Sequence, residues 1–217
     1  MEIFFWIIAF IVAITVHEAA HAYAADKLGD PTPKLMGRLS LNPLVHYDPT
    51  GTTLLLVLVI LRSLGFPVIP FGWAKPVQFD PYNLKNPRRD SALISLAGPL
   101  SNLILATILS IFLRIYSTYL VGFSLMGDIF IPLVMLNTVL AVFNLIPIHP
   151  LDGGKILVGI LPYEGAKKTE RFLRRYGTLI LFFLIFPTFG GNSLLFTIIG
   201  PVLNFLLSLF IPGGMIV

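Results

Sequence analysis

Apolar residues in this chain gather into long uncharged blocks and do not follow the spacing of an amphipathic helix or strand. Asp, Glu, Lys and Arg are absent from residues 3–16, 91–113, 129–151 and 176–217. A helix needs about 20 largely apolar residues to cross the hydrocarbon core of a bilayer. The second and third blocks reach that length, the fourth could cross twice, and the first reaches it if its helix continues to about Ala25. The pattern predicts an all-α fold, a polytopic membrane helical bundle.

The composition supports this fold class. Hydrophobic residues make up 56% of the 217 positions and charged residues only 12%, with a mean hydropathy of +0.86. These values lie outside the usual balance of a soluble domain. No basic side chain precedes Ile3, so the first block is expected to remain as a helix and not to be removed as a signal peptide. One membrane domain, residues 1–217, is expected to account for the whole sequence.

The end of the first block carries side chains that lipid disfavours. His17, Glu18 and His21 form the sequence HEAAH. Residues four apart share one face of a helix, so the two imidazoles can be directed at one point. Two neutral imidazoles suit Zn²⁺, and the acid between them can act as general base on a zinc-bound water. The alternative is a hydrogen-bonded polar cluster at the helix end, but ionisable groups in membrane segments usually mark functional sites.

A catalytic zinc takes a third protein ligand and leaves a fourth position open. The candidate is Asp152 in the stretch FNLIPIHPLDGGKIL, because it is the only acid between Asp128 and Glu164. The two glycines that follow it allow the backbone to turn and to approach closely. His149 is a rival ligand, and Asp152 is preferred because two histidines with one carboxylate form a known type of zinc site. Asp152 could instead be a turn residue at a helix end. The chain has no cysteine, so thiolate ligands are excluded.

HEAAH together with NLIPIHPLDGG resembles the site-2 protease family of intramembrane zinc metalloproteases. The stretches NPLVHYDPTG, GWAKPV and AGPLSN also resemble its compact members, and this chain shows neither the PDZ nor the CBS domain of larger members. The resemblance implies one Zn²⁺ per chain, held by His17, His21 and Asp152, with Glu18 as the base. It further implies that Asn144 binds the substrate or the developing oxyanion, and that the substrate is a transmembrane protein.

A shared metal site restricts how the chain can cross the membrane. Both motifs lie near the C-terminal ends of their blocks, so those two helices must run in the same direction. Residues 91–113 supply one opposite crossing, so residues 51–70 are expected to form a re-entrant segment between the first two core helices. Arg62 and several prolines and glycines in that segment agree with this interpretation. Residues 176–217, broken at 187–192, are expected to make two short crossings or one hairpin.

The basic residues then fall mainly on one side. Those between the first and second core helices share a side with residues 155–175, whereas Arg114 lies opposite. The positive-inside rule places the N-terminus outside the cell membrane and the site near the cytoplasmic face. Flanking charges also account for the net charge of +4 without a nucleic-acid partner. Residues 167–175 are expected to form an interfacial anchor, with a partner-docking surface as the alternative.

Other polar residues are expected to have structural roles. His46 and Asp48 could bind a second metal or the substrate, but loop ordering is favoured because Asp-Pro and Asn-Pro form turns. Gly98 is expected to permit close helix packing, and Asn102 to form a hydrogen bond between helices.

Two rival functions use similar residues. A membrane metal transporter would carry polar residues through the full thickness of several helices, whereas here they gather at one depth. A non-catalytic scaffold would usually complete its zinc site with four protein ligands. We therefore expect a zinc endopeptidase that acts within the lipid bilayer. A homo-oligomer or an accessory membrane protein remains compatible with the sequence.

Overall fold

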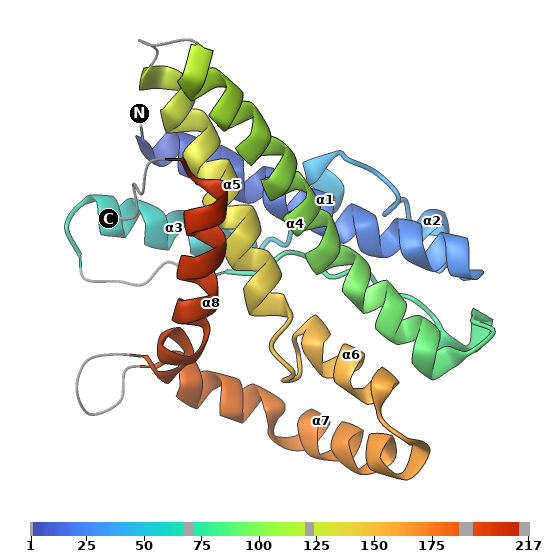
Figure 1. Ribbon diagram of the computed structural model, residues 1–217. Helices are drawn as coiled ribbons and strands as arrows, with labels where there is room; N and C mark the ends of the chain where they lie inside the picture. Colours follow the sequence, from blue (N-terminus) through green and yellow to red (C-terminus); the bar gives the residue numbers. More distant parts are fainter. Residues whose placement is uncertain (1, 67–71, 120–123, 187–192, 213–217) are drawn as a thin grey trace.

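The computed structural model describes residues 2–66, 72–119, 124–186 and 193–212, and most of them are helical. This described part contains no β-strand, which confirms the all-α prediction (Figure 1). The longer helices are α1 (Glu2–Leu28), α4 (Pro87–Tyr119), α5 (Ser124–Asn144) and α7 (Tyr163–Ile185). The shorter ones are α2 (Thr32–Leu35), α3 (Gly51–Ser63), α6 (Asp152–Ile160) and α8 (Leu194–Phe210).

Within the described residues, three helices are long and apolar enough to cross a membrane, and they coincide with the first three apolar blocks. The qualifying stretches are Ile3–Leu28 in α1, Pro87–Ser117 in α4 and Met126–Asn144 in α5. The chain is therefore a helical membrane protein by length and composition.

Hydrogen bonds between these helices show the directions in which they run relative to one another. Asn102 donates a hydrogen bond to the carbonyl of Ala13, whereas the carbonyl of Ile94, two turns earlier in α4, accepts one from His21. Helices α1 and α4 are therefore antiparallel. Asn102 also bonds Asn137, and Figure 1 shows α5 returning along α4. Consequently α1 and α5 run in the same direction, as predicted from a metal site near the C-terminal ends of their two apolar blocks.

One face of α1 determines how closely the core helices approach. Ala9, Ala13, His17, His21 and Ala25 follow one another at intervals of four, and all are buried. Small residues at such an interface let two helix backbones come close together. The alanine stripe therefore turns the two histidines toward α4 and α5.

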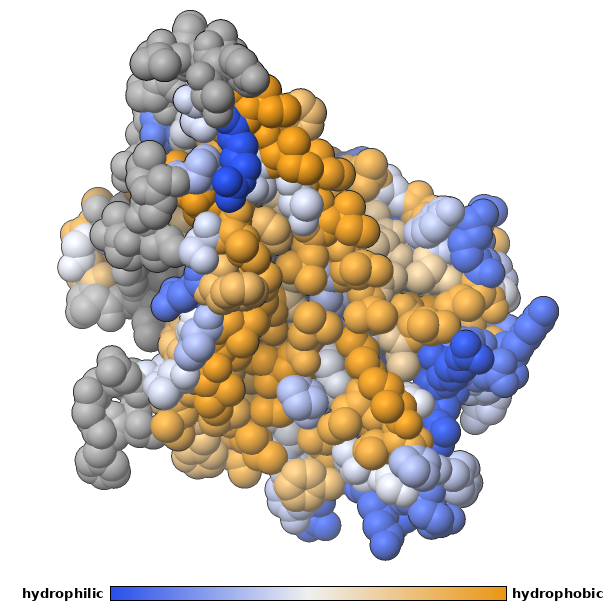
Figure 2. All heavy atoms as spheres, in the orientation of Figure 1, coloured by the Kyte–Doolittle hydropathy of each residue, from blue (hydrophilic) through white to orange (hydrophobic). Residues whose placement is uncertain are grey.

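The outer surface of the bundle is hydrophobic. Ile104, Ile108 and Phe112 of α4 and Phe205 of α8 are between 46% and 63% exposed. Figure 2 shows a broad hydrophobic surface across the middle of the bundle, with hydrophilic side chains where α1 ends, α4 begins and α6 joins α7. An exposed apolar surface of this extent is the one that a lipid-facing bundle presents. We call the hydrophilic region the polar end.

The segment that was predicted to be re-entrant leaves and returns at one place in the fold. Helix α3 begins at Gly51, and a Cβ on Gly72 would lie only 2.4 Å from the Gly51 carbonyl oxygen. Close by, the N–H of Lys75 donates to the carbonyl of His46 at 2.9 Å. Residues 67–71 are outside the described residues. Gly51 and Gly72 therefore lie side by side, and the re-entrant path between them stays a prediction.

In the C-terminal part, the helix boundaries differ from the boundaries of the apolar blocks. Helix α7 joins the basic stretch and the beginning of the last block into one helix, which begins at the polar end and runs away from it along the bottom of the view (Figure 1). Helix α8 packs against α5 through Val142, Leu195, Ile199 and Leu203. The proposed break at 187–192 lies outside the described residues, so the choice between two crossings and a hairpin stays a prediction.

Candidate metal centre

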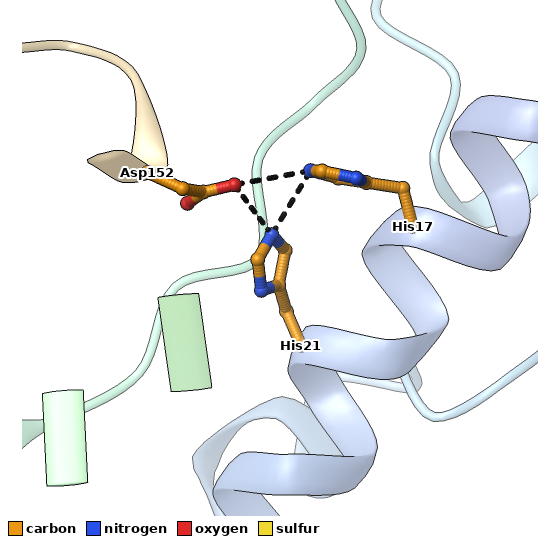
Figure 3. A group of neighbouring side chains, drawn as sticks. All are labelled: His17, His21 and Asp152. Carbon is orange, nitrogen blue, oxygen red and sulfur yellow. Dashed lines mark hydrogen bonds and ion pairs between the residues drawn. The ribbon is translucent and has the colours of Figure 1, made fainter. Parts of the chain in front are cut away.

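Three predicted ligands meet at one point between α1 and the start of α6. Figure 3 shows the imidazoles of His17 and His21 and the carboxylate of Asp152 directed toward one another. The two Nε2 atoms are 3.1 Å apart, and they lie 3.2 and 3.1 Å from Asp152 Oδ2. Among the described residues, this is the group of histidines and acids that could hold a metal ion.

The other ring nitrogens reveal how the two imidazoles are protonated. His17 Nδ1 lies 2.6 Å from Asn102 Oδ1, and His21 Nδ1 lies 2.7 Å from the Ile94 carbonyl oxygen. The Asn102 amide nitrogen donates to the Ala13 carbonyl, so its oxygen must face His17. Both Nδ1 atoms therefore donate, which leaves each Nε2 as an acceptor turned toward Asp152. Outer partners of this kind fix the tautomer and orientation of metal-binding histidines.

Asp152 reaches the histidines because the chain turns tightly after α5. It is the first residue of α6, and a Cβ on the next residue, Gly153, would lie 2.2 Å from the Ile146 carbonyl oxygen. Only glycine allows this close approach of two backbone segments. The glycines after Asp152 therefore place its carboxylate beside α1.

The geometry and chemistry of the cluster fit Zn²⁺. Three acceptor atoms close together repel one another unless a cation lies among them. A tetrahedral zinc with bonds of about 2.0–2.1 Å keeps its ligand atoms roughly 3.3 Å apart, close to the separations of the two Nε2 atoms and Oδ2. Three protein ligands also leave the fourth position that a catalytic zinc requires.

Glu18 lies beside the cluster but is not part of it. Its carboxylate is buried and accepts a hydrogen bond of 2.8 Å from the N–H of Val77. Val77 belongs to the extended segment that follows α3, the stretch GWAKPV of the sequence. The return of the chain after α3 therefore orients the predicted base.

Gly98 makes room for both imidazoles. A Cβ at this position would lie 2.4 Å from His21 Nε2 and 2.7 Å from His17 Cε1. The sequence predicted a packing role for Gly98, and the structure shows that the side chains packed against it are those of the two predicted ligands His17 and His21. Any side chain here must displace the atoms that face Asp152.

We expect Gly98→Ala to weaken zinc binding by at least the ~10–100-fold that loss of an outer-shell partner causes. The protein should still fold, because the helix preference of Ala over Gly, up to ~1 kcal/mol, partly offsets the cost of displacing the imidazoles. Gly200→Ala in α8 is the matched control, since nothing lies within 4 Å of a Cβ there. Zinc titration and thermal unfolding of both purified variants test this. Equal zinc affinities would contradict the spacing role of Gly98.

The remaining candidates lie apart from the cluster. Asn144 ends α5, and its amide donates to the Leu140 carbonyl at 3.0 Å, a bond within its own helix and not to the three predicted ligands. His149 is half-buried; burial lowers its pKa, and the positive charges of Lys155 and Arg174 lower it further. His149 is also absent from the metal-compatible group.

The loop residues order the chain, as the sequence favoured. Buried His46 bonds the Ser40 carbonyl through Nε2 at 2.9 Å. Asp48 Oδ1 accepts hydrogen bonds from the N–H groups of Thr50 and Gly51, which caps the start of α3.

Three features of the site were not assigned from the sequence: the acceptor Asn102 for His17, the N–H of Val77 for Glu18, and the space at Gly98. One signal was present for two of them. Gly98 and Asn102 are four residues apart in an apolar helix and therefore share a face. The contact from Val77 has no local signal, because it joins residues 59 positions apart.

An open cleft of about 820 Å³ leads from the polar end toward this site. Its walls include Val77, which holds Glu18, and Gly154, which follows the Asp152 turn. His149 also lines it, together with Val158 of α6 and Leu173 of α7. The cleft is therefore an approach from the polar end to the residues beside the metal cluster.

Comparisons with known proteins agree with this site. The sequence profile of peptidase family M50 matches residues 5–129 and 121–187. A Bacillus subtilis (strain 168) protein named "Putative zinc metalloprotease YwhC" is 40% identical over 209 residues, which cover 94% of this chain and 90% of that protein. "Zinc metalloprotease MJ0392" of Methanocaldococcus jannaschii is 27% identical over 196 residues, 88% of this chain and 46% of that protein. No solved structure gives a significant match. Since the profile covers most of the chain, the protein belongs to peptidase family M50, the site-2 protease family, and is a zinc metalloprotease.

Proposed function

We propose that this protein is an intramembrane endopeptidase that hydrolyses peptide bonds in or near transmembrane segments of other membrane proteins. The observation that carries the proposal is that His17 and His21 of the metal cluster lie within α1, a helix of membrane-spanning length. His21 precedes the last residue of α1, Leu28, by about two turns, or roughly 10 Å of helix rise. The cluster therefore lies about two helical turns away from the polar end, within the apolar part of the bundle.

The chain's own residues divide the chemistry among them. His17, His21 and Asp152 would hold one Zn²⁺, which when bound supplies Lewis acidity and lowers the pKa of a water toward about 7. Glu18 accepts a proton from the attacking water and passes it to the leaving amine. The Val77 N–H holds the Glu18 carboxylate in one orientation. The open cleft admits water from the polar end.

The substrate must present an unwound backbone. An intact membrane helix satisfies its carbonyl groups internally, so the scissile bond becomes accessible only after local unwinding. The extended segment around Val77 is suited to hold such a strand by backbone pairing beside Glu18. Asn144 would exchange its bond to the Leu140 carbonyl for one to the substrate or the developing oxyanion.

Zinc analysis of the purified protein, combined with cleavage of a model transmembrane peptide, tests this function. We expect one zinc per chain and cleavage within or next to the apolar segment of the peptide. Loss of cleavage after zinc removal, and recovery on zinc addition, would support the assignment. A zinc-loaded protein that cleaves no membrane peptide but hydrolyses soluble peptides would contradict the intramembrane part.

The membrane topology gives an independent prediction. We propose a multi-pass protein of the cell membrane, with its N-terminus outside and the polar end in the cytoplasm. The chain has no cysteine, and Lys34, Lys85, Lys168 and Ser117 are exposed. Single cysteines at the three lysines should therefore react with a membrane-impermeant thiol reagent from the cytoplasmic side only, and one at Ser117 only from the other side.

The decisive pair in that experiment is Lys34 and Lys85, which flank α3 in the sequence. Labelling of both from one face supports the re-entrant segment, because the chain between them then makes no net crossing. Labelling from opposite faces would mean that residues 51–70 cross the membrane. That outcome would contradict the topology and the shared depth of the two ligand motifs.

A further inference from the structure

The open cleft beside the metal cluster carries an excess of positive charge. Arg88 in the first turn of α4, Lys155 of α6 and Arg174 of α7 line it, and all three are exposed. Glu170 is the acid among the lining residues, and its carboxylate lies 4.0 Å from the Arg174 guanidinium. Three cations against one acid leave the cleft with a positive potential that favours anionic ligands.

The cations come from three different helices and converge on one hollow. The Lys155 ammonium lies 4.9 Å from the ring centre of Phe79, so the extended segment after α3 directs it across the cleft. His149 also lines the cleft, and burial together with the charges of Lys155 and Arg174 lowers its pKa. The cations therefore act on one shared space.

The apolar part of the lining indicates what accompanies the anionic group. Val77, Phe79, Val158 and Leu173 contribute hydrophobic walls between the cations. A volume of about 820 Å³ lies within the range of pockets that bury a ligand of modest size, about 300–1,000 Å³. A cleft lined by both apolar and cationic side chains suits a short extended peptide that carries acidic side chains.

We propose that this cleft binds the part of a peptide substrate that leaves the membrane next to the scissile bond, and that it selects acidic residues there. The inference rests on the proposed function. The occupant follows from connectivity: a chain bound beside Glu18 and Asp152 continues past Val77 and Gly154, and both of these line the cleft. The cleft thereby gives the site a preference for acidic substrate residues outside the bond that is cut.

Binding of matched peptides to the Glu18→Gln protein tests this selection without turnover. Two labelled peptides share one transmembrane segment, which is followed on the polar side by either Asp-Glu-Asp or Asn-Gln-Asn. Zinc-loaded protein in phosphatidylcholine nanodiscs is titrated with each peptide. We expect the acidic peptide to bind about fivefold to tenfold tighter, since each exposed charge pair contributes up to about fivefold. The preference should shrink as salt is raised.

The chain offers matched control positions on the same helices. Arg88→Glu combined with Arg174→Glu should abolish or reverse the preference, measured as the ratio of the two dissociation constants. Arg89→Glu combined with Arg171→Glu makes the same charge change at exposed positions of α4 and α7 outside the cleft lining. This control pair should keep the preference for the acidic peptide.

The outcomes separate this inference from the protease function. Equal binding of both peptides, or equal effects of the two double variants, would overturn the cleft proposal even if wild-type protein cleaves both peptides. Absence of cleavage by wild-type protein, with selective acidic binding retained, would instead count against the protease function.

Discussion

Replacing Glu18 with Gln is expected to leave zinc bound while peptide hydrolysis falls by about 10²–10⁴-fold, the usual loss when a general base is removed. The amide keeps the size of the side chain, and its oxygen can still accept the hydrogen bond from the Val77 N–H. The predicted ligands His17, His21 and Asp152 are unchanged. The variant therefore removes proton acceptance and little else. Zinc content and the cleavage rate of a transmembrane peptide are the two measurements.

The control for this prediction is Glu164→Gln, the same change at an exposed position in the first turn of α7. That variant should keep both zinc and activity. Full activity in Glu18→Gln would contradict the role of Glu18 as the base. Loss of zinc from Glu18→Gln would show instead that this carboxylate supports the metal.

Asp152→Ala is expected to lower zinc affinity by more than the ~10–100-fold that loss of an outer-shell partner causes, and to abolish cleavage. The reason is geometric, because Asp152 Oδ2 is the third corner of the cluster, 3.2 and 3.1 Å from the two Nε2 atoms. His149→Ala should keep most zinc binding, since His149 is not in the metal-compatible group. Zinc titration of both variants, with Asp152→Asn as a variant of equal size, measures the difference.

The contrast between Asp152 and His149 decides the third ligand. If His149→Ala loses zinc and Asp152→Ala retains it, the ligand assignment is wrong, although the helical fold would stand. If both variants retain zinc, the cluster is not the metal site. Thermal unfolding of the variants with zinc removed distinguishes a lost ligand from a misfolded turn.

Much of the fold could be predicted from local pattern. The blocks at residues 3–16, 91–113 and 129–151 correspond to α1, α4 and α5, because apolar length alone identifies a helix that can span lipid. The boundaries were less well predicted. Helix α4 extends to Pro87 and Tyr119, and α7 continues from a basic stretch into an apolar one. The charged residues therefore show where the surroundings of a helix change from apolar to polar, and not where the helix ends.

The candidate site divides in the same way. The pair His17 and His21 follows from helix geometry, since a spacing of four places both on one face. Asp152 could be chosen as a candidate because acids are rare in its neighbourhood, but spacing alone left His149 as a rival. The structure separates the two, because the glycine turn after α5 brings only the carboxylate to the imidazoles.

The sequence by itself determined that this protein is suited to a lipid bilayer, which segments form its long helices, and which residue types make up the predicted metal site. These are local properties, set by apolar length and by a four-residue repeat. The tertiary structure alone decided that Asn102 and the Ile94 carbonyl orient the histidines, that Val77 holds Glu18, and that Gly98 leaves room for the ligands. These contacts join α1 to residues 59 to 85 positions away. Their partners are two carbonyl oxygens, a backbone N–H and the space beside a glycine, and none of these has a sequence signature until the helices pack.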